Sequence, residues 1–269
     1  MRAVIAILVA VAVAAGAVAL ASGPRSDGGD GGSTLRRYEL RSRFVHRTLS
    51  QVAALPPGGG QGRPLLVFLH GRGTRGHEAN ANGAFLRALA AQGTRAPVVV
   101  FPNGAEASYW HKRRSGDWTR YVLDEVIPAA VKRFGADADR VAIGGISMGG
   151  YGAYEIARTR PRRFCAVGGH SAANWLSAGE TAPGAFDDAA DYARHDVVGA
   201  ARRAGRAPWR KAALWLDGGD RDPFLRADRT LAKALGIRMR VWPGGHDGGY
   251  WQRHYGDYLR FYGRALARC

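Results

Sequence analysis

The chain has 269 residues, of which 46% are hydrophobic, which is enough for one large or two small globular domains. Lysine and arginine number 39 against 22 aspartate and glutamate residues, a formal net charge of +17 at pH 7. This composition excludes a disordered or collagen-like chain, and two cysteines are too few for a disulfide-dense miniprotein or a four-cysteine zinc cluster. The charge alone favours an anionic partner, such as a nucleic acid or a charged surface.

The amino terminus has the pattern of an export signal. Arg2 precedes an apolar stretch at residues 3–20, and the small residues at 19 and 21 suit signal-peptidase cleavage after Ala21. We therefore predict a signal peptide at residues 1–21 and a secreted or extracytoplasmic protein. An uncleaved anchor is the alternative, because the apolar stretch approaches the roughly 20 residues that span a bilayer. Residues 22–34 are glycine-rich and predict a flexible linker, so the folded domain is expected at 35–269.

Strand and helix patterns alternate along the rest of the chain. Residues 37–52 alternate in polarity, which predicts an antiparallel edge hairpin. Short apolar runs then predict strands at 64–69, 96–101, 140–146, 164–168, 212–217 and 237–241. Helical spacing or composition follows at 79–91, 118–134, 149–158, 225–235 and 249–267. Because the runs are continuously apolar, we expect a single α/β domain with a mostly parallel central sheet and helices on both faces.

Residues 171–211 form the longest stretch without a strand pattern, and they follow the sixth predicted strand. Amphipathic patterning around 186–195 favours a short segment that covers the binding crevice, because ligands bind beyond the carboxyl ends of parallel strands. A disordered insertion is the alternative.

A nucleophile motif follows the strand at 140–146. Residues 145–149 read Gly-Ile-Ser-Met-Gly, which matches the G-x-S-x-G nucleophile elbow. With 38 glycines in the chain the bare pattern is weak evidence. Its context is stronger, since a strand runs directly into the motif and small residues follow where a helix must pack closely. We therefore predict that Ser147 is a nucleophile.

A serine nucleophile needs a base, and the base needs an orienting acid, in the chain order Ser, acid, His for this kind of fold. His246 fits best as the base, because it lies in a glycine-rich loop just past the last predicted strand. Asp222 is the favoured acid, since Pro223 keeps it extended beyond a strand end. Asp220 is the alternative, and the competing role for either aspartate is to cap the following helix. The remaining downstream histidines, His170, His195 and His254, lack this placement.

Catalysis at a carbonyl also requires donors for the oxyanion. The backbone N–H of Met148, directly after the nucleophile, is the first expected donor. The second should come from the loop after the strand at 64–69, where we favour Arg72 over Gly71; His70 is expected to hold this loop.

The segments LVFLHGRG, GGISMGGYGAY, LDGGDRDPF and PGGHDGGYW, in this order and spacing, resemble the α/β-hydrolase superfamily. More narrowly, they are similar to the esterase family that includes S-formylglutathione hydrolases, feruloyl and acetylxylan esterases and secreted mycolyltransferases, over about residues 60–262. The resemblance implies a Ser147, Asp222 and His246 triad, an acyl-enzyme intermediate and no cofactor or metal. The substrate would be a carboxylic ester on a small molecule or a polysaccharide. Gly248 departs from the family pattern, in which an aromatic residue often follows His-Asp.

The loop at 102–118 should lie on the same face as the nucleophile. Its aromatic and imidazole side chains could form a stacking wall for an aryl or sugar group, and His170 could line the same pocket; the wall residues are Tyr109, Trp110 and His111. The cations that follow, at 112–114, could recognise an anionic substituent. A solvated basic loop with one buried aromatic residue is the alternative.

Two other functions are possible, one that uses the same triad and one that does not use it. An acyltransferase would replace water by an alcohol acceptor at the same triad. A non-catalytic protein that binds an anionic polymer would use the charge instead, but the chain has no known nucleic-acid-binding motif, and no nucleic-acid partner is expected. The charge then predicts association of an exported enzyme with an anionic cell envelope. Cys165 and Cys269 could pair in an oxidising compartment, since the last helix runs back toward the strand that Cys165 begins; two free thiols are the alternative.

Overall fold

A computed structural model describes residues 26–28, 32–73 and 75–269 of the protein. The predicted signal peptide or anchor at 1–21 lies outside the described residues. Within the described part, no helix combines the length and the hydropathy needed to cross a membrane.

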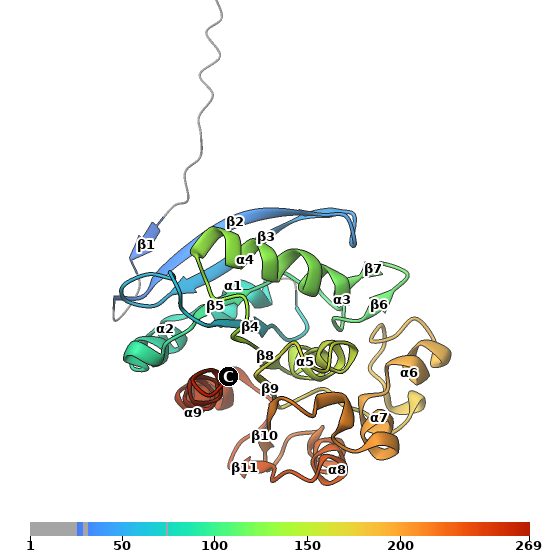
Figure 1. Cartoon of the computed structure of the whole chain (residues 1–269). Helices are drawn as coiled ribbons and strands as arrows, with labels where there is room; N and C mark the ends of the chain where they lie inside the picture. The colour runs from blue at the N-terminus through green and yellow to red at the C-terminus, as the bar shows by residue number, and fades with distance from the viewer. Residues whose placement is uncertain (1–25, 29–31, 74) are drawn as a thin grey trace, which may run out of the picture.

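One large sheet organises the described residues (Figure 1). Its strand order is β1-β2-β3-β5-β4-β8-β9-β10-β11. The bounds are β1 (Ser26–Gly28), β2 (Thr34–Ser42), β3 (Arg47–Leu55), β4 (Leu65–Leu69), β5 (Val98–Phe101), β8 (Val141–Ile146), β9 (Ala166–His170), β10 (Ala213–Gly219) and β11 (Arg240–Trp242). All pairs from β5 to β11 are parallel, whereas β1, β2 and β3 pair antiparallel. The mostly parallel sheet and its antiparallel hairpin confirm the predicted fold class.

The amino-terminal side of the sheet differs from the prediction in one place. Ser26–Gly28, inside the expected linker, pairs with Arg36, Leu35 and Thr34 of β2. The long β2 leaves backbone N–H and C=O groups unpaired on its outer edge, and three residues of the expected linker satisfy part of that edge.

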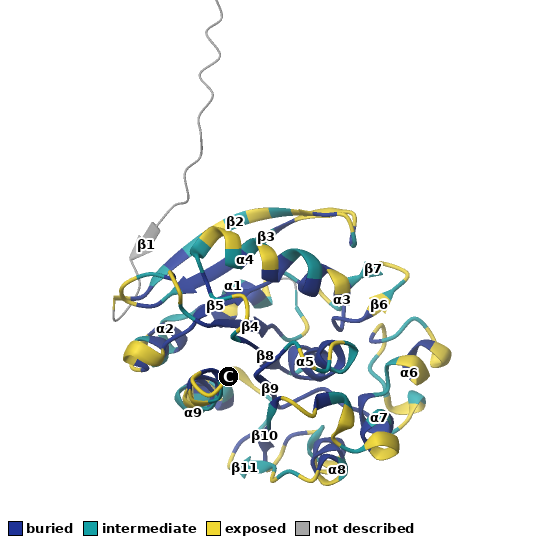
Figure 2. Ribbon diagram, in the orientation of Figure 1, coloured by how far each residue is buried: buried dark blue, intermediate teal, exposed yellow. Residues whose placement is uncertain are grey.

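Helices lie on both faces of the sheet, whose central strands are buried (Figure 2). Successive residues of a strand contribute to opposite cores. In β4, Leu66 and Phe68 pack with α2 and α9, whereas Val67 packs with α4 and α5. This alternation is what strands buried on both faces require. The helices are α1 (Gly76–Asn80), α2 (Gly83–Ala90), α3 (Trp118–Arg120), α4 (Ile127–Phe134), α5 (Met148–Thr159), α6 (Ala189–His195), α7 (Val197–Ala204), α8 (Leu225–Leu235) and α9 (Gly248–Leu266), and short 3-10 turns are η2 (Gly93–Arg95), η4 (Ala178–Glu180) and η5 (Ala207–Trp209).

The helix predicted at 118–134 is present but irregular. A π-helical stretch, η3 (Tyr121–Val126), separates α3 from α4. Pro128 is the second residue of α4 and cannot donate a backbone hydrogen bond to the preceding turn. The wider π turn accommodates this missing donor.

The segment after β9 is ordered rather than a disordered insertion, and it contains η4, α6, α7 and η5. The short β6 (Lys112–Arg113) and β7 (Gly116–Asp117) form a separate hairpin beside it.

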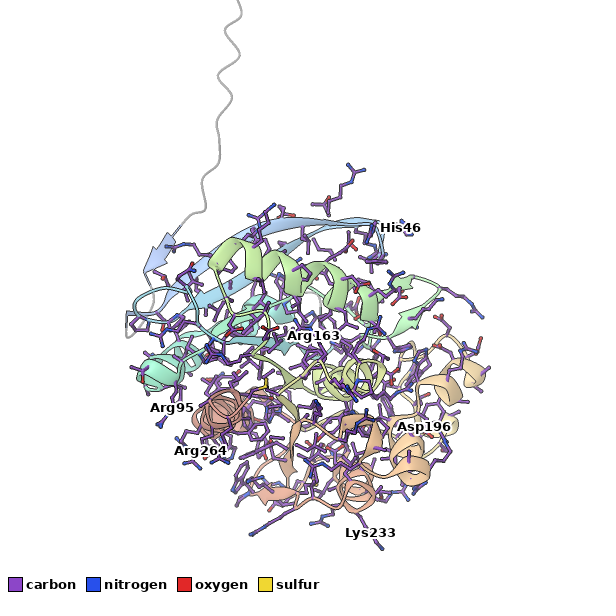
Figure 3. The ribbon with its side chains drawn as sticks, viewed as in Figure 1. His46, Arg95, Arg163, Asp196, Lys233 and Arg264 are labelled. Atoms are coloured by element: carbon purple, nitrogen blue, oxygen red, sulfur yellow. A yellow bond between two sulfur atoms is a disulfide. The ribbon has the colours of Figure 1, made fainter. Side chains whose placement is uncertain are left out.

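Cys165 and Cys269 form a disulfide, as one of the two alternatives predicted (Figure 3). It joins residues 104 positions apart, linking the end of the chain to the residue before β9.

Candidate active site

Ser147 occupies a strained turn between β8 and α5. Its φ is 52° and its ψ is −118°, a backbone conformation that L-residues rarely adopt. The glycines on either side make this turn fit, because a Cβ at Gly145 or Gly149 would overlap the carbonyl oxygen of Leu69 on β4. The side chain of Ser147 is thereby held at the carboxyl edge of the sheet, where a nucleophile elbow presents its hydroxyl.

His246 lies opposite this hydroxyl. It sits in the loop between β11 and α9, just before Asp247, whose side chain caps α9 by accepting from the backbone N–H of Tyr250. The Nε2 atom of His246 is 2.8 Å from Ser147 Oγ. Its Nδ1 atom is 3.0 Å from Asp222 Oδ2. The structure thus brings the three predicted residues into one hydrogen-bonded series.

Asp222 is the buried end of this series, with 1% of its side chain exposed. Its second oxygen accepts from the backbone N–H of Phe224 at 2.9 Å. Burial by itself raises the pKa of Asp222, but the hydrogen bond and charge of His246 and the Phe224 N–H outweigh it and hold the pKa below its ordinary value. The carboxylate therefore stays ionised beside the imidazole.

Asp220, the alternative acid, has a different partner. Its Oδ1 accepts from the backbone N–H of Gly244 at 2.9 Å, and the N–H of Arg221 donates to the Gly244 carbonyl. These bonds fasten the loop that carries His246 to the loop that carries Asp222. Asp220 braces the site and does not contact the imidazole.

The loop after β4 is fixed by a buried, neutral histidine. His70 Nε2 accepts from the backbone N–H of Gly104 at 2.9 Å, so the proton lies on Nδ1, which donates to the Gly71 carbonyl at 2.6 Å. The pKa of His70 is lowered to about 4, mainly by burial; the hydrogen bond to the Gly71 carbonyl opposes this effect, and the nearby His77 adds to it. In a trans peptide the N–H of Arg72 points opposite to the Gly71 carbonyl, and so away from His70.

A pocket of about 400 Å³ opens beside Ser147. Its lining comes from the loop after β4, the α1–α2 region, the elbow and the start of α9: Gly71, Arg72, Gly76, Ala79, Asn80, Asn82, Ile146, Ser147, His246, Gly248, Trp251, Gln252 and Tyr255. The ring of Trp251 meets that of His246 edge to face at 5.2 Å between centroids. The sequence reasoning did not find Trp251 and Tyr255. Their spacing of four residues on the helix that follows His246 was the available signal.

The predicted aromatic wall is wrong, because Tyr109, Trp110 and His111 are buried and do not line this pocket. The Trp110 ring fills the space that a Cβ at Gly104 or Gly152 would need. The loop is instead covered by residues that follow β9, which the local sequence could not reveal.

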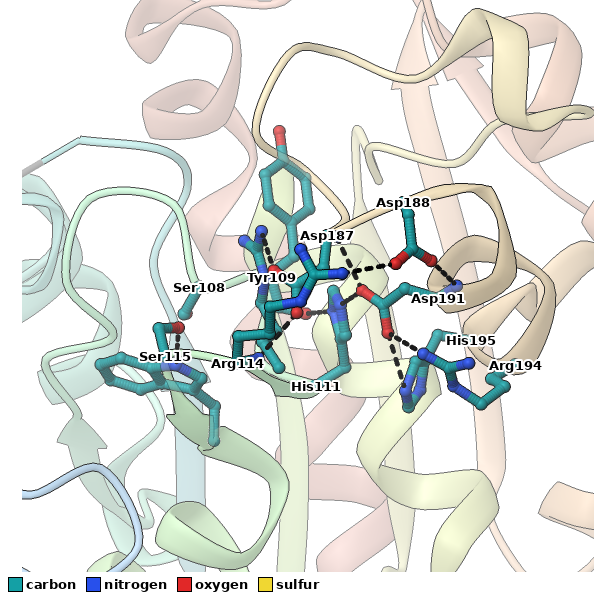
Figure 4. A network of polar contacts seen from close by, with 12 residues as sticks. Ser108, Tyr109, His111, Arg114, Ser115, Asp187, Asp188, Asp191, Arg194 and His195 are labelled. Atoms are coloured by element: carbon teal, nitrogen blue, oxygen red, sulfur yellow. Dashed lines mark hydrogen bonds and ion pairs between the residues drawn. The ribbon is translucent and has the colours of Figure 1, made fainter.

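His111 belongs to a polar network between this loop and α6 (Figure 4). Its Nε2 lies 3.1 Å from Asp191 Oδ2, and its ring stacks on Phe186. Burial and the neighbouring His195 lower the pKa of His111, while Asp191 opposes them. The network holds the covering segment to the loop.

The cations after His111 have the same role. Arg113 pairs with Asp187 at 3.0 Å and Arg114 with Asp188 at 2.8 Å, so both arginines are neutralised within the protein. Lys112 is exposed on β6. The prediction that these residues recognise a substrate anion is therefore not supported by their placement.

The prediction that His170 lines the substrate pocket is also wrong, since this residue is fully buried in the core. Its Nδ1 lies 2.6 Å from Asp217 Oδ1, and its Nε2 lies 2.9 Å from the Tyr262 hydroxyl. The other oxygen of Asp217 accepts from the hydroxyls of Tyr250 and Tyr258 on α9. This network ties β9 and β10 to the helix that follows His246.

Comparison with known proteins fits this geometry. The model of a family described as putative esterase matches residues 45–255. The chain belongs to this family. It is 27% identical to an S-formylglutathione hydrolase of Paracoccus denitrificans over 265 residues, covering 85% of this chain and 92% of that protein. The family assignment makes it a carboxylic ester hydrolase.

Solved structures of such esterases share the fold. An S-formylglutathione hydrolase from Agrobacterium tumefaciens superimposes with a TM-score of 0.74 at 19% identity, over 91% of this chain and 99% of that one. A ferulic acid esterase gives a TM-score of 0.76 at 24% identity, over 87% and 98%. These similarities confirm the α/β-hydrolase fold.

Proposed function

We propose that this esterase is an exported serine hydrolase that cleaves carboxylic esters through Ser147, His246 and Asp222. The observation that carries the proposal is the unbroken series of hydrogen bonds from Ser147 Oγ through both imidazole nitrogens to a buried carboxylate, at the mouth of a pocket. A neutral imidazole in this position accepts the serine proton, and the carboxylate stabilises the imidazolium that results.

The reaction proceeds in two halves. Ser147 Oγ attacks the ester carbonyl carbon while its proton moves to His246 Nε2, and the carbonyl oxygen becomes an oxyanion. When the intermediate collapses, the bond to the alcohol oxygen breaks, the alcohol takes the proton from His246, and an acyl group remains on Ser147. Water then gives a proton to His246 and attacks the acyl carbon, and Ser147 leaves with that proton as the acid is released.

Two backbone donors are proposed for the oxyanion. Met148 opens α5, and the first N–H groups of a helix have no partner within it. Arg72 lines the pocket with its N–H directed away from His70, and a Cβ at Gly71 would lie 3.2 Å from the Ser147 Cβ, so the two loops are in close contact. Such donors stabilise the charge that develops on the carbonyl oxygen.

The pocket supports an ester on a small molecule or on a polysaccharide. Trp251 and Tyr255 offer aromatic surface, and Asn80 and Asn82 offer polar groups, a combination that suits an aryl or sugar moiety. The chain resembles both an S-formylglutathione hydrolase and a ferulic acid esterase. The first name indicates a small-molecule thioester as substrate, and the second indicates an ester of an aryl acid. An acyltransferase would use the same residues with an alcohol in place of water.

Export is supported by the disulfide between Cys165 and Cys269, because such bonds persist in oxidising compartments. The mass of the protein recovered outside the cytoplasm tests cleavage: a chain that begins at Ser22 is expected. Recovery of the full-length chain from the membrane fraction would instead assign residues 1–21 as an anchor.

Hydrolysis of a panel of aryl acyl esters tests the chemistry. Wild type should turn over at least one of them, and Ser147→Ala should lose turnover and fluorophosphonate labelling while it keeps its melting temperature. Adding an alcohol and analysing the products separates transfer from hydrolysis. Equal turnover by Ser147→Ala would remove the catalytic assignment.

A further inference from the structure

A second cleft, of about 430 Å³, shares no lining residue with the pocket beside Ser147. It is formed by the last turns of α9, by β10 and by the first residue of β11. Its lining residues are Ala213, Trp215, Arg240, Asp257, Arg260, Phe261, Arg264, Ala265 and Arg268. Four of these nine residues are arginines and one is acidic, so the cleft is strongly cationic.

Three of the arginines form a column. Arg260, Arg264 and Arg268 follow at intervals of four residues along α9 and just past its end, so they share one face (Figure 3 labels Arg264). Like charges at this spacing repel one another. The favourable interaction of cations with a helix carboxyl terminus offsets this for Arg264 and Arg268. It does not explain why Arg240, on a strand, points into the same cleft.

Most of this charge is not neutralised within the protein. Asp257 accepts from Arg260 at 2.5 Å and is the acidic residue of the cleft. Among the described residues, no carboxylate lies at ion-pair distance from the guanidinium groups of Arg240, Arg264 or Arg268. Three cations therefore face one cleft without an ion pair of their own among the described residues, and Asp257 is paired with Arg260.

Arg240 is held in place by an aromatic ring. Its guanidinium carbon lies 3.5 Å from the centroid of Trp215, whose indole N–H donates to Asp217. Burial lowers the pKa of Arg240, Asp217 and Asp257 oppose this effect, and Arg238 adds to it. Stacking uses the face of the guanidinium and leaves N–H groups at its edge for an acceptor. A partly desolvated cation of this kind gains by binding an anion.

The disulfide fixes the other side of the cleft. Cys269 follows Arg268 directly, and Cys165 accepts through its carbonyl from the backbone N–H of Ala213, which lines the cleft. Through the disulfide, Arg268 is therefore held close to β10, the strand that contains Ala213. A terminus constrained in this way loses less conformational entropy when a ligand binds than a free terminus would.

We propose that this cleft is an anion-binding site for a phosphate-class oxyanion, either free or as part of a phosphate-bearing polymer. A tetrahedral anion presents three or four acceptor oxygens, which can receive N–H groups from Arg240, Arg264 and Arg268 together. A carboxylate presents only two. The site is independent of the hydrolase chemistry and gives part of the +17 charge a specific location.

Calorimetric titration of the full-length chain tests the site, with inorganic phosphate in one arm and short inorganic polyphosphate in the other. The variant is Arg264→Gln with Arg268→Gln, both exposed. The matched control is Arg202→Gln with Arg229→Gln, which removes the same charge from exposed positions on α7 and α8, the helices on the opposite face of the sheet. Loss of two charge-assisted contacts should weaken binding at least about tenfold in the cleft variant, and the control should bind like wild type.

The two arms identify the source of the anion. Saturable binding of inorganic phosphate assigns a single anion, and binding of polyphosphate alone assigns a polyanion. Three results overturn the proposal: the wild type binds neither anion, the control variant weakens as much as the cleft variant, or the cleft variant binds as tightly as the wild type. Aryl ester hydrolysis should be equal in both variants, so failure of the anion site would leave the triad untouched.

Discussion

Substituting the two neighbouring aspartates by asparagine separates orientation of the base from bracing of its loop. Asp222→Asn places an amide against His246 Nδ1, where Asp222 Oδ2 now lies at 3.0 Å. The amide N–H donates to Nδ1, which forces the imidazole proton onto Nε2. His246 then faces Ser147 Oγ with a donor at 2.8 Å and cannot accept its proton. A wrong tautomer of this kind costs about 10⁴-fold in kcat, or roughly 5.5 kcal/mol of transition-state stabilisation.

Asp220→Asn is the matched control, because it makes the same isosteric change two residues away on the same loop. The amide oxygen can still accept from the Gly244 N–H, which Asp220 Oδ1 receives at 2.9 Å. We expect kcat to fall by less than about tenfold, since one hydrogen bond weakens by about 1 kcal/mol without loss of the acceptor. The assay is kcat on an aryl acyl ester, with the melting temperature measured for each variant. If Asp222→Asn kept a tenth of wild-type turnover, or if Asp220→Asn lost as much as Asp222→Asn, the assignment of the acid would be wrong.

Three further predictions concern the frame of the site. Lowering the pH from about 6.5 to about 4 should reduce the free energy of unfolding by about 3 kcal/mol through His70. Over this window the imidazole binds a proton in the unfolded chain but stays neutral in the folded protein, where its pKa is about 4. Urea unfolding at both pH values should show this loss of stability in the wild type and not in His70→Gln. An equal change in the free energy of unfolding between the two pH values in both proteins would contradict the prediction. Cys269→Ser should lower the free energy of unfolding by about 4.7 kcal/mol, because it opens a loop between residues 104 positions apart; an unchanged urea midpoint would refute this estimate. Gly149→Ala should abolish turnover or prevent folding, because its Cβ would overlap the Leu69 carbonyl; a stable variant with normal kcat would show that the elbow tolerates the side chain.

The hydrogen-bonded series of Ser147, His246 and Asp222 could be predicted because each of these residues follows a strand whose pattern is visible in the sequence. Parallel strands end at one edge of a sheet, so the loops after β8, β10 and β11 had to meet there. The choice between Asp220 and Asp222 was harder, since both lie in one short loop. Pro223 was the useful signal, because it kept the residue before it extended.

The residues expected to contact substrate could not be placed in this way. Whether His111 faces solvent or core depends on Asp191, which lies 80 positions later in the segment after β9. His170 likewise depends on Tyr262, 92 positions away on α9. Local patterns show which residues follow a strand but not which distant segment covers them. The same limit explains why Trp251 and Tyr255 were missed, since their helix showed only an amphipathic pattern.

The buried contacts also explain how three loops from separate parts of the chain hold a hydrogen-bonded series. Asp217 on β10 is paired in register with Arg240 of β11. Its carboxylate accepts hydrogen bonds from two tyrosine hydroxyls of α9, and these bonds fix that helix against β10. Because His246 immediately precedes the capped start of α9, fixing the helix also fixes the imidazole. Asp220 then fastens the loop before it through Gly244. The imidazole is held from both sides, by the buried Asp217 through α9 and by the exposed Asp220 through Gly244, and a site held by such hydrogen bonds needs little reorganisation during reaction.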